Sequence, residues 1–449
     1  MEARWGVRAF ERQYRERQAS WRLGFMEDRE MEQHWKWLAG IDWAREKHHV
    51  CLMDGRGQVH GERSFPHDGA GLAALADWLL SLTGGPPAEV HVAIETPEGP
   101  VVESLMGFGF ALHAINPKQL DRFRDRHSPA GAKDDSRDAW VLSDALRTDP
   151  HCFRQLRPQH ASQIELRACS RLAEELKVER GRLACRMREQ LWRYYPQFPE
   201  LVGEVADDWA LALWRLLPTP QKARRVRPDS IAKLLKAHRI RRLDAEAVRQ
   251  ALAAPAPEVT DGTVDAACRH LNSLVHRIRL LNRQRRQCQK DLDRLTQAYA
   301  ASLQEQADGP PGQRQGQRDV AILKSLPGIA RTNLAALLAE APEALQRRDY
   351  HALRCLCGTA PVTRQSGKTR IVSRRLAVNW RLVNAVYHWA MTAIQHDPKS
   401  KAKYYALRQK GHSHGRALRS VSDRLLAVAC AMLRDHTLYD PRHNQHAQT

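Results

Sequence analysis

The sequence predicts an α/β domain with a mixed sheet, followed by long helices and a mainly α C-terminal part. Up to about residue 150, short apolar runs alternate with polar breaks and turn residues, whereas long stretches with apolar residues at helical spacing follow. The chain has 449 residues, which is too long for one compact core and sufficient for two or three domains. We therefore expect an α/β domain at 37–150 and helical domains after it.

The α/β region opens with three extended segments. They are "WLAGIDW" from Trp37, "HHVCLM" before the Asp54-Gly55 turn, and the alternating "QVHGERSF". A helix from about 70 to 82, the buried strand "AEVHVAIE", the helical "VVESLMGFG" and the extended "FALHAIN" follow. Three hairpin strands followed by alternating helix and strand are the order expected of a ribonuclease-H-like (RuvC-like) fold.

The rest of the chain reads as helical. Arginine-studded amphipathic helices are expected at about 162–194 and 266–301, and they are candidates for an antiparallel coiled coil within 151–306. Between them lie Pro/Ala-rich breaks and the basic "QKARRVRP". Residues 307–318 have linker composition, and 319–449 would form the C-terminal domain. Residues 1–36 are either an accessory helix or an extension from an early start codon, with Met26 and Met31 as alternative starts.

The charge distribution points to a polyanionic partner. Lys and Arg total 71 against 51 acidic residues, which gives a net charge of +20. The first 150 residues carry −5, whereas residues 151–300 carry +12 and the remainder +13. No apolar run reaches the roughly 20 residues that span a bilayer. The nine scattered cysteines lack the density of a disulfide framework, so a cytoplasmic location, at the nucleoid when bound to DNA, is expected.

Four carboxylates are candidates for a metal site. Asp42 and Glu95 stand where buried strands give way to polar sequence, and Asp135 and Asp138 are spaced i, i+3 on one helix face. Such carboxylates would repel one another unless cations held them, which suits Mg²⁺ in phosphoryl transfer. Each residue alone is more often a cap, a turn or a solvated position. From spacing alone, Asp134 could replace Asp135.

A serine among cations is the second candidate. Ser366 lies in a Ser-Gly-Lys turn whose neighbours could neutralise a phosphodiester transition state. The alternative is a flexible basic loop that only touches phosphates. A phosphate-binding P-loop is excluded, because its first glycine would fall at Val362. The basic neighbours are Arg364, Lys368, Arg370, Arg374 and Arg375.

A Leu-Pro-Gly-Ile turn opens a further helix in "LKSLPGIARTNLAALLAE". A helix-hairpin-helix element of this kind presents backbone amides to a nucleic-acid phosphate. Gly328 is therefore a candidate nucleic-acid-binding residue. A plain turn between two helices is the alternative.

Together these motifs resemble the DEDD-type insertion-sequence transposases that also carry a serine nucleophile, a family of bridge-RNA-guided DNA recombinases. The resemblance runs from about Trp37 over most of the chain. It rests on "GIDWAREKHHV", "AIETPEG", "NPKQLDRFR", "KDDSRDA", "LPGIA" and "CGTAPVTRQSGKTR", in family order. The family pattern K-x-D-x-x-D-A falls on Lys133, Asp135, Asp138 and Ala139, which favours Asp135 over Asp134. The basic insert at about 207–263 is longer than the family core requires.

The resemblance implies a composite active site. Asp42, Glu95, Asp135 and Asp138 would bind Mg²⁺, expected as two ions that Mn²⁺ can replace, and Ser366 would attack a DNA phosphodiester. The serine of one protomer would work with the acidic site of another, so the helical middle would serve dimerisation and tetramer assembly. A structured noncoding RNA, held in part by the basic helices, would pair with donor and target DNA.

Two other functions compete with this one. A metal-dependent nuclease of the Holliday-junction resolvase kind would use water as nucleophile and tolerate loss of Ser366. A nucleic-acid-binding scaffold or decayed transposase would need neither the four carboxylates nor the serine. The presence of all four acidic residues and the serine argues against decay.

Overall fold

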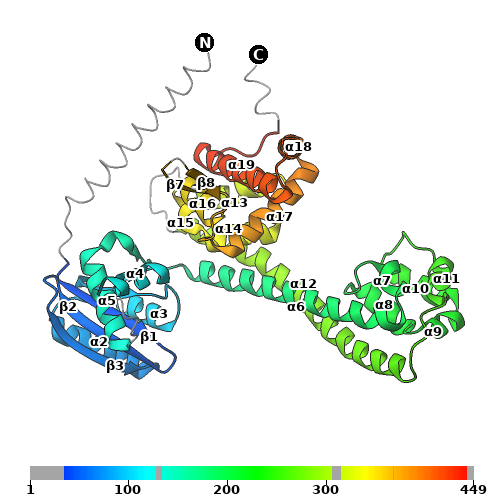
Figure 1. Ribbon diagram of the computed structural model, residues 1–449, viewed down its shortest axis with the longest axis horizontal. Coiled ribbons are helices and arrows are strands. Elements are labelled where there is room, and N and C mark those ends of the chain that lie inside the picture. Colours follow the sequence, from blue (N-terminus) through cyan, green and yellow to red (C-terminus); the bar gives the residue numbers. More distant parts are fainter. Residues whose placement is uncertain (1–34, 128–133, 306–314, 368, 442–449) are drawn as a thin grey trace, which may run out of the picture. The chain divides into compact units, whose positions relative to one another are not determined.

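The computed structural model describes residues 35–127, 134–305, 315–367 and 369–441 (Figure 1). The chain divides into two compact units, one up to Pro158 and one from Gln159 onwards, and each is described by itself.

The first unit is built on a six-stranded mixed sheet with the strand order β3-β2-β1-β4-β5-β6. β2 pairs antiparallel with both β1 and β3, whereas β1, β4 and β5 run parallel. The strand order agrees with the predicted hairpins followed by alternating helix and strand. Only the short β6, antiparallel to β5, was not predicted. The strands are β1 Trp37–Trp43, β2 Lys47–Asp54, β3 Val59–Pro66, β4 Val90–Ile94, β5 Ala111–Ala114 and β6 Arg154–Gln155.

Helices cover both faces of this sheet. α2 (Gly69–Thr83) and α3 (Pro100–Gly107) pack on one face, while α4 (Pro117–His127) and α5 (Asp135–Thr148) cover the other. Because successive side chains of a strand point to opposite faces, Ala39 and Ile41 join the core beneath α2 and α3, and Leu38 joins the core beneath α5. Apolar runs that are buried on both faces explain why these strands read as continuous hydrophobic sequence.

Gly40 brings α5 against β1. A Cβ atom at this position would lie 2.0 Å from the carbonyl oxygen of Ala139 and 2.7 Å from the amide nitrogen of Ser143. The Ser143 hydroxyl, buried at the same contact, donates to the carbonyl of Cys51 at 2.9 Å. The absence of a side chain at residue 40 therefore lets the helix touch the strand backbone.

The second unit contains the two long helices that the sequence predicted. α6 (Ala161–Tyr194) and α12 (Thr263–Glu305) pack antiparallel, because Ser162 meets Ser302 at 2.8 Å near one end and Arg180 meets Asn282 at 3.0 Å further along. The segment between them, which contains the basic insert, folds into a helical cap that shares an apolar core with α6 and α12 around Tyr195, Phe198 and Trp214. Its helices are α7 Gln197–Val202, α8 Asp208–Leu216, α9 Pro220–Arg225, α10 Pro228–Ala237 and α11 Ala245–Ala253.

The C-terminal part is mainly helical and packs around the buried Trp389. It departs from the expected run of helices at one place, where β7 and β8 form an antiparallel hairpin. Of the predicted linker, residues 307–314 lie outside the described residues and 315–318 belong to the first turn of α13. The elements are α13 Gln315–Ser325, α14 Arg331–Glu340, α15 Pro342–Gln346, α16 Tyr350–Leu356, β7 Val362–Ser366, β8 Thr369–Ser373, α17 Trp380–His396, α18 Pro398–Gln409 and α19 His414–Asp435.

The remaining expectations concern cysteines and membranes. All nine cysteines are free thiols, although the sulfur atoms of Cys169 and Cys288 lie 3.5 Å apart between α6 and α12. Among the described residues, none of the helices combines the length and apolar character needed to cross a bilayer. Most of the predicted extension at residues 1–36, up to residue 34, lies outside the described residues.

Candidate active site

Asp42 and Glu95 lie side by side at the ends of neighbouring parallel strands. β1 and β4 are in register up to the pair Ile41 and Ile94, and the residues that follow this pair are Asp42 and Glu95. By the two-residue alternation, Asp42 shares its face with Leu38, which packs beneath α5. Glu95 likewise shares its face with Ala93. Strand geometry therefore directs both carboxylates toward the side that carries α5.

The start of α5 supplies the other two carboxylates. Asp134 is the N-cap, and its carboxylate accepts a hydrogen bond from the amide of Ser136 at 3.3 Å. Asp135 and Asp138 lie in the first helical turn, where the helix dipole favours negative charge. Asp138 is only 2% exposed. The capping bond gives Asp134 a structural role and leaves Asp135 as the neighbour of the other acids.

Arg124 of α4 is the cation that meets this acidic group. Its guanidinium binds both carboxylate oxygens of Asp138, at 2.7 and 2.9 Å, and lies 3.7 Å from Glu95. It also donates to Asp121 at 2.7 Å. Lys47, from β2, lies 3.4 Å from Asp135. The bidentate contact with the buried Asp138 is the strongest of these interactions.

The electrostatics of Asp42 show that the four carboxylates influence one another. Burial raises the pKa of Asp42 to about 6, and the negative charges of Asp138, Asp135 and Glu95 add to this effect, while Arg124 opposes it. The carboxyl is therefore partly protonated near neutral pH. A cation that neutralised its neighbours would lower this pKa again.

The donor chemistry suits a hard divalent cation. Carboxylate oxygens are the ligands that Mg²⁺ prefers, and the four acids repel one another in its absence. Within the described part of the chain, however, no three Asp, Glu, His or Cys side chains are already arranged to hold a metal ion. Arg124 occupies the place of a cation between Asp138 and Glu95. The residues fit Mg²⁺ chemically, provided that Arg124 releases Asp138.

Ser366 lies at the end of β7, paired in register with Thr369 of β8. The turn between the strands contains Gly367, whose φ of 53° is a left-handed conformation that glycine adopts without strain. Ser366, Arg364 and Arg370 are exposed, as are nearly all residues of both strands. The predicted site residue Lys368 lies outside the described residues. The hydroxyl thus stands near a hairpin tip with arginines on both strands.

The base of the hairpin combines crowded arginines with exposed apolar side chains. The guanidinium of Arg374 lies over the ring of Trp380 at 5.2 Å. Burial lowers the pKa of Arg419, and the nearby Arg374 and Arg416 lower it further. The Nε of Arg375 is buried without a hydrogen-bond partner among the described residues. The exposed apolar residues are Ile371, Val372, Leu376 and Trp380.

Gly328 has a structural reason to be glycine. Its φ is +76°, and a Cβ atom there would lie 2.5 Å from the backbone nitrogen of Ala393 in α17. The indole of Trp389 donates to the carbonyl of the adjacent Pro327 at 2.8 Å. These contacts tie the turn between α13 and α14 to α17. The predicted phosphate contact of Gly328 stays a prediction.

The four predicted acidic residues are thus neighbours in the first unit, while Ser366 and the predicted basic residues belong to the second unit. Sequence reasoning missed Arg124 and Lys47 as partners of the acids. The available signal was the basic character of "NPKQLDRFR" close before the acidic helix.

Comparison with known proteins identifies the family. A model described as a DEDD transposase of the IS110 type matches residues 39–196, and one described as the transposase IS116/IS110/IS902 family matches residues 320–405. A protein from Sinorhizobium fredii, named as transposase y4uE, is 59% identical over 208 residues, which cover 46% of this chain and 58% of that protein.

Two relatives from Streptomyces coelicolor match over nearly their whole length. A protein named as the mini-circle transposase for IS117 is 31% identical over 413 residues, 89% of this chain and 94% of the relative. An uncharacterized 43.6 kDa protein of the insertion element IS110 is 25% identical over 90% of this chain and 95% of its own length. The chain therefore belongs to the IS110/IS116 family of insertion-sequence transposases.

Proposed function

We propose that this transposase cuts and rejoins DNA strands by phosphoryl transfer, with a ribonuclease-H-like first unit that supplies a Mg²⁺ site and a serine nucleophile supplied by the second. The observation that carries the proposal is the convergence of Asp42, Glu95, Asp135 and Asp138 on one face of the sheet, with a half-buried guanidinium as their counter-ion.

The four carboxylates would hold two Mg²⁺ ions. Bound metal would supply positive charge at the phosphate that reacts. Before metal binds, different contacts hold each of these side chains in place. Asp138 is fixed by Arg124, and Asp135 by its position in the first turn of α5. Arg124 keeps the acids together until metal and DNA take over neutralisation of their charge.

Ser366 would act as the nucleophile. Its oxygen forms a bond to the DNA phosphorus as the bond from phosphorus to a DNA oxygen breaks; the serine hydroxyl loses a proton, and the leaving oxygen gains one. Attack by a hydroxyl of the exchanged strand on the phosphoserine reverses these changes, so strands are exchanged without net hydrolysis. Support comes from the exposed hairpin position of Ser366, with Arg364 on the same face of its strand and Arg370 next to its partner Thr369.

The basic side chains around the hairpin would neutralise DNA phosphates. The crowding of Arg374, Arg416 and Arg419 is relieved when an anion binds between them. Lys368 and Arg375 would contribute to the same surface, and the turn at Gly328 would contact a phosphate through backbone amides. Donor and target duplexes and a structured noncoding guide RNA are the proposed nucleic-acid partners.

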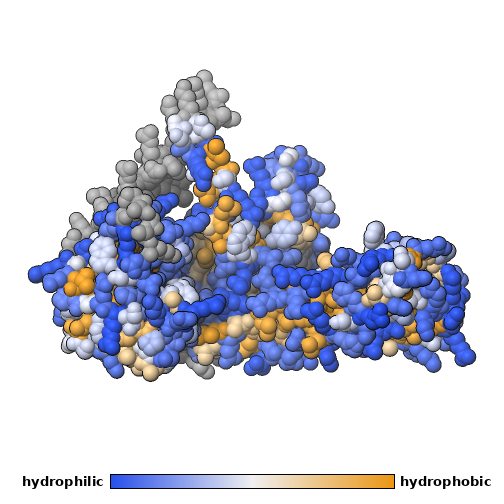
Figure 2. Space-filling view, turned by 60° about the horizontal axis from the view of Figure 1, so that its bottom comes forward, coloured by the Kyte–Doolittle hydropathy of each residue, from blue (hydrophilic) through white to orange (hydrophobic). Residues whose placement is uncertain are grey.

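An apolar stripe on α6 supports dimerisation. Val178, Cys185 and Trp192 follow a seven-residue spacing, and all three are exposed, Trp192 by 73%. They lie on the side of α6 away from α12, whose partners include Leu176 and Leu183. Figure 2 shows hydrophobic surface along the long helices. A second copy would cover this stripe, and two dimers would form the synaptic tetramer.

A covalent-adduct assay tests the chemistry. Labelled donor DNA is incubated with protein, Mg²⁺ and the RNA transcribed from the noncoding flank of the gene, and protein-bound label is measured on a denaturing gel. The wild type and Ser373→Ala, the exposed serine at the base of the same hairpin, should form the adduct, and Ser366→Ala should not. Cleavage by Ser366→Ala at the wild-type rate would favour the water-using nuclease instead.

The acidic set has a matched pair of variants. Asp135→Asn removes a proposed ligand, whereas Asp134→Asn keeps a good N-cap residue. We expect loss of cleavage in the first variant and near wild-type cleavage in the second. The reverse result would transfer the ligand role to Asp134.

The dimer is tested by sedimentation of wild type, Trp192→Glu and the exposed control Arg186→Glu. An interface tryptophan contributes about 2 kcal/mol or more, so Trp192→Glu should weaken the dimer roughly 30-fold. Equal dimer strength in all three proteins would exclude this stripe as the interface.

A further inference from the structure

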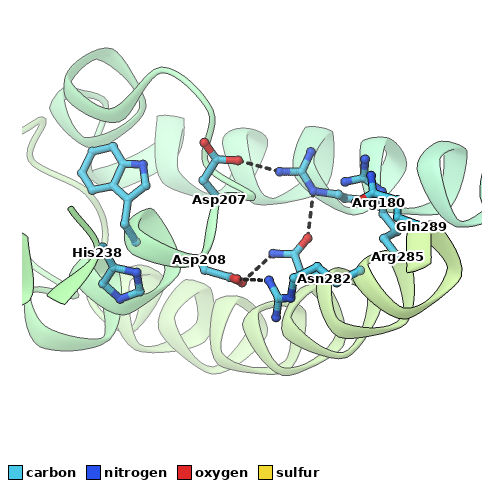
Figure 3. A pocket seen from close by; sticks show the side chains of 9 residues that line it. Arg180, Asp207, Asp208, His238, Asn282, Arg285 and Gln289 are labelled. Atoms are coloured by element: carbon cyan, nitrogen blue, oxygen red, sulfur yellow. Dashed lines mark hydrogen bonds and ion pairs between the residues drawn. The ribbon is translucent and has the colours of Figure 1, made fainter. Parts of the chain in front are cut away.

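A pocket of about 340 Å³ opens where α6, α8 and α12 meet beside the helical cap (Figure 3). It lies in the region of the basic insert, far in sequence from both proposed reacting groups. Its lining is polar and contains three arginines against two aspartates. The lining residues are Arg180, Asp207, Asp208, Trp209, His238, Asn282, Arg285, Arg286 and Gln289.

Both aspartates already have polar partners in the pocket wall. Asp207 accepts a hydrogen bond from Arg180 at 2.8 Å. Asp208 accepts one from Asn282 at 2.7 Å and is paired with Arg286. Asn282 also accepts a bond from Arg180 at 3.0 Å and donates to the carbonyl of Ala206 at 2.9 Å. Figure 3 shows this chain of contacts along one side of the pocket.

Arg285 is the arginine of the lining that takes no part in this network. It is half-buried, and it has neither a hydrogen bond nor an ion pair with any residue that the structure describes. Burial lowers the pKa of its guanidinium and the neighbouring positive charge of Arg180 lowers it further, while the carboxylates of Asp207 and Glu204 oppose this shift. Arg279, close to Asp208, is crowded by Arg215 in the same way. Arginines thus outnumber the acids of the lining, and Arg285 makes no hydrogen bond or ion pair with either aspartate.

The size and the walls of the pocket indicate what neutralises this charge. A guanidinium fork matches the paired oxygens of a phosphate, and the pocket has room beyond a single phosphate group. The exposed His238 provides a ring surface and the exposed Gln289 an amide, which are groups that hold a nucleotide, while the buried Trp209 and Asn282 complete the lining. The adjoining loop carries the further cations Arg239, Arg241 and Arg242.

We propose that this pocket binds an unpaired nucleotide of a structured RNA, with its phosphate on Arg285. This inference rests on the proposed use of a guide RNA. A pocket favours RNA over duplex DNA, because bulged and looped nucleotides project from folded RNA, whereas the phosphates of a regular duplex lie on its convex outer surface. The insert would thereby recognise RNA shape rather than base sequence.

The test measures binding of full-length protein to a short RNA hairpin with one bulged nucleotide, the same hairpin without the bulge, and a DNA copy of the bulged hairpin. Arg285→Gln is compared with Arg283→Gln, an exposed arginine of α12 outside the pocket. We expect Arg285→Gln to lose about tenfold in affinity for the bulged RNA and little for the unbulged one. Arg283→Gln should lose less and affect both RNAs equally.

Stability and a second variant separate binding from folding. Arg285→Gln removes a crowded charge and should melt no earlier than wild type, and His238→Ala at the exposed rim should reproduce the selective loss. Equal losses for bulged and unbulged RNA, no loss in Arg285→Gln, or no bulge preference in wild type would overturn the proposal. Equally tight and equally sensitive binding of bulged DNA would overturn the choice of RNA. The serine adduct assay reports on the proposed chemistry independently, because it can succeed when this pocket plays no part.

Discussion

The acidic face of the first unit and the serine hairpin of the second hold their functional groups in opposite ways. Asp138 is 2% exposed and fixed by two hydrogen bonds from Arg124, on a helix that touches the sheet backbone. Ser366 stands on a two-stranded hairpin with almost every residue exposed. Repelling carboxylates need a rigid frame and a counter-ion, whereas the proposed nucleophile, which must meet DNA, needs access.

The largest expected effect comes from inactivating the serine or an acidic residue and then combining the two variants in one dimer. Ser366→Ala and Asp135→Asn should each reduce recombination between donor and target plasmids by about 10³ or more. If the serine of one protomer serves the acids of another, a mixed dimer contains one composite site with both changes and one with neither. Mixing the variants should therefore restore product. Failure of the mixture, with both variants still dimeric, would place both groups in one protomer.

A smaller effect is expected when the counter-ion is removed. Arg124→Ala leaves the buried Asp138 without its partner, which costs about 3 kcal/mol and lowers Tm by roughly 6–12 °C. Mg²⁺ should then raise Tm more in the variant than in wild type, because no guanidinium has to be displaced. Thermal melts with and without Mg²⁺ measure both changes.

The control for Arg124 is Arg126→Ala on the same helix, an exposed residue whose partner Asp149 lies 3.5 Å away. It should change neither the Tm nor the response to Mg²⁺. An identical response to Mg²⁺ in wild type and Arg124→Ala would show that Arg124 does not compete with metal.

On the hairpin, single charges should have modest effects. Arg370→Ala should weaken DNA binding for all sequences alike and reduce the slope of log affinity against log salt by about one. Gln365→Ala, its neutral neighbour across the hairpin, should leave that slope unchanged. Binding titrations at several salt concentrations decide, and an unchanged slope in Arg370→Ala would remove it from the DNA interface.

The smallest effect is the pH dependence of Asp42. Its pKa of about 6 in the folded protein exceeds the ordinary value of 3.8, so the folded state binds the proton more tightly. The stabilisation that the protonated Asp42 gives the folded state is complete below about pH 4 and is lost as pH rises through 6. Asp42→Asn should therefore raise Tm at pH 7 without metal, by roughly 2–4 °C, and less at pH 4.

The exposed Asp77→Asn on α2 is the control for Asp42, and it should shift Tm equally at both pH values. A Tm of Asp42→Asn that stayed at or below wild type at pH 7 would contradict the electrostatic cost of the ionised carboxylate.

Sequence reasoning located the proposed reacting groups better than the residues that contact them. Asp42 and Glu95 were found because a strand that ends at a polar residue is visible in one dimension. The ambiguity at Asp134 had a local cause, an N-cap bond to Ser136, that spacing alone does not reveal. Arg124 could not be singled out, because a basic helix shows its charges but not which carboxylate each one meets.

The second unit shows the same limit. The ranges of α6 and α12 followed from periodicity, but the hairpin at Ser366 did not, since its exposed strands bury no apolar pattern. The pocket at Arg285 is lined by four segments that are separate in sequence. Only the folded chain reveals that Arg285 takes no part in the contacts made by Asp207 and Asp208.

Gly40 fixes the geometry of the acidic residues because glycine has no Cβ atom. Since α5 rests on the backbone of β1 at Ala139, the residue next to Asp138, the two carboxylate-bearing elements meet at a fixed separation two residues before Asp42. Connecting segments elsewhere can lengthen, shorten or change in sequence while this contact is kept. Diversification of the regions that select nucleic acid is thereby uncoupled from the chemistry, and one methyl group at residue 40 would be enough to disturb that chemistry.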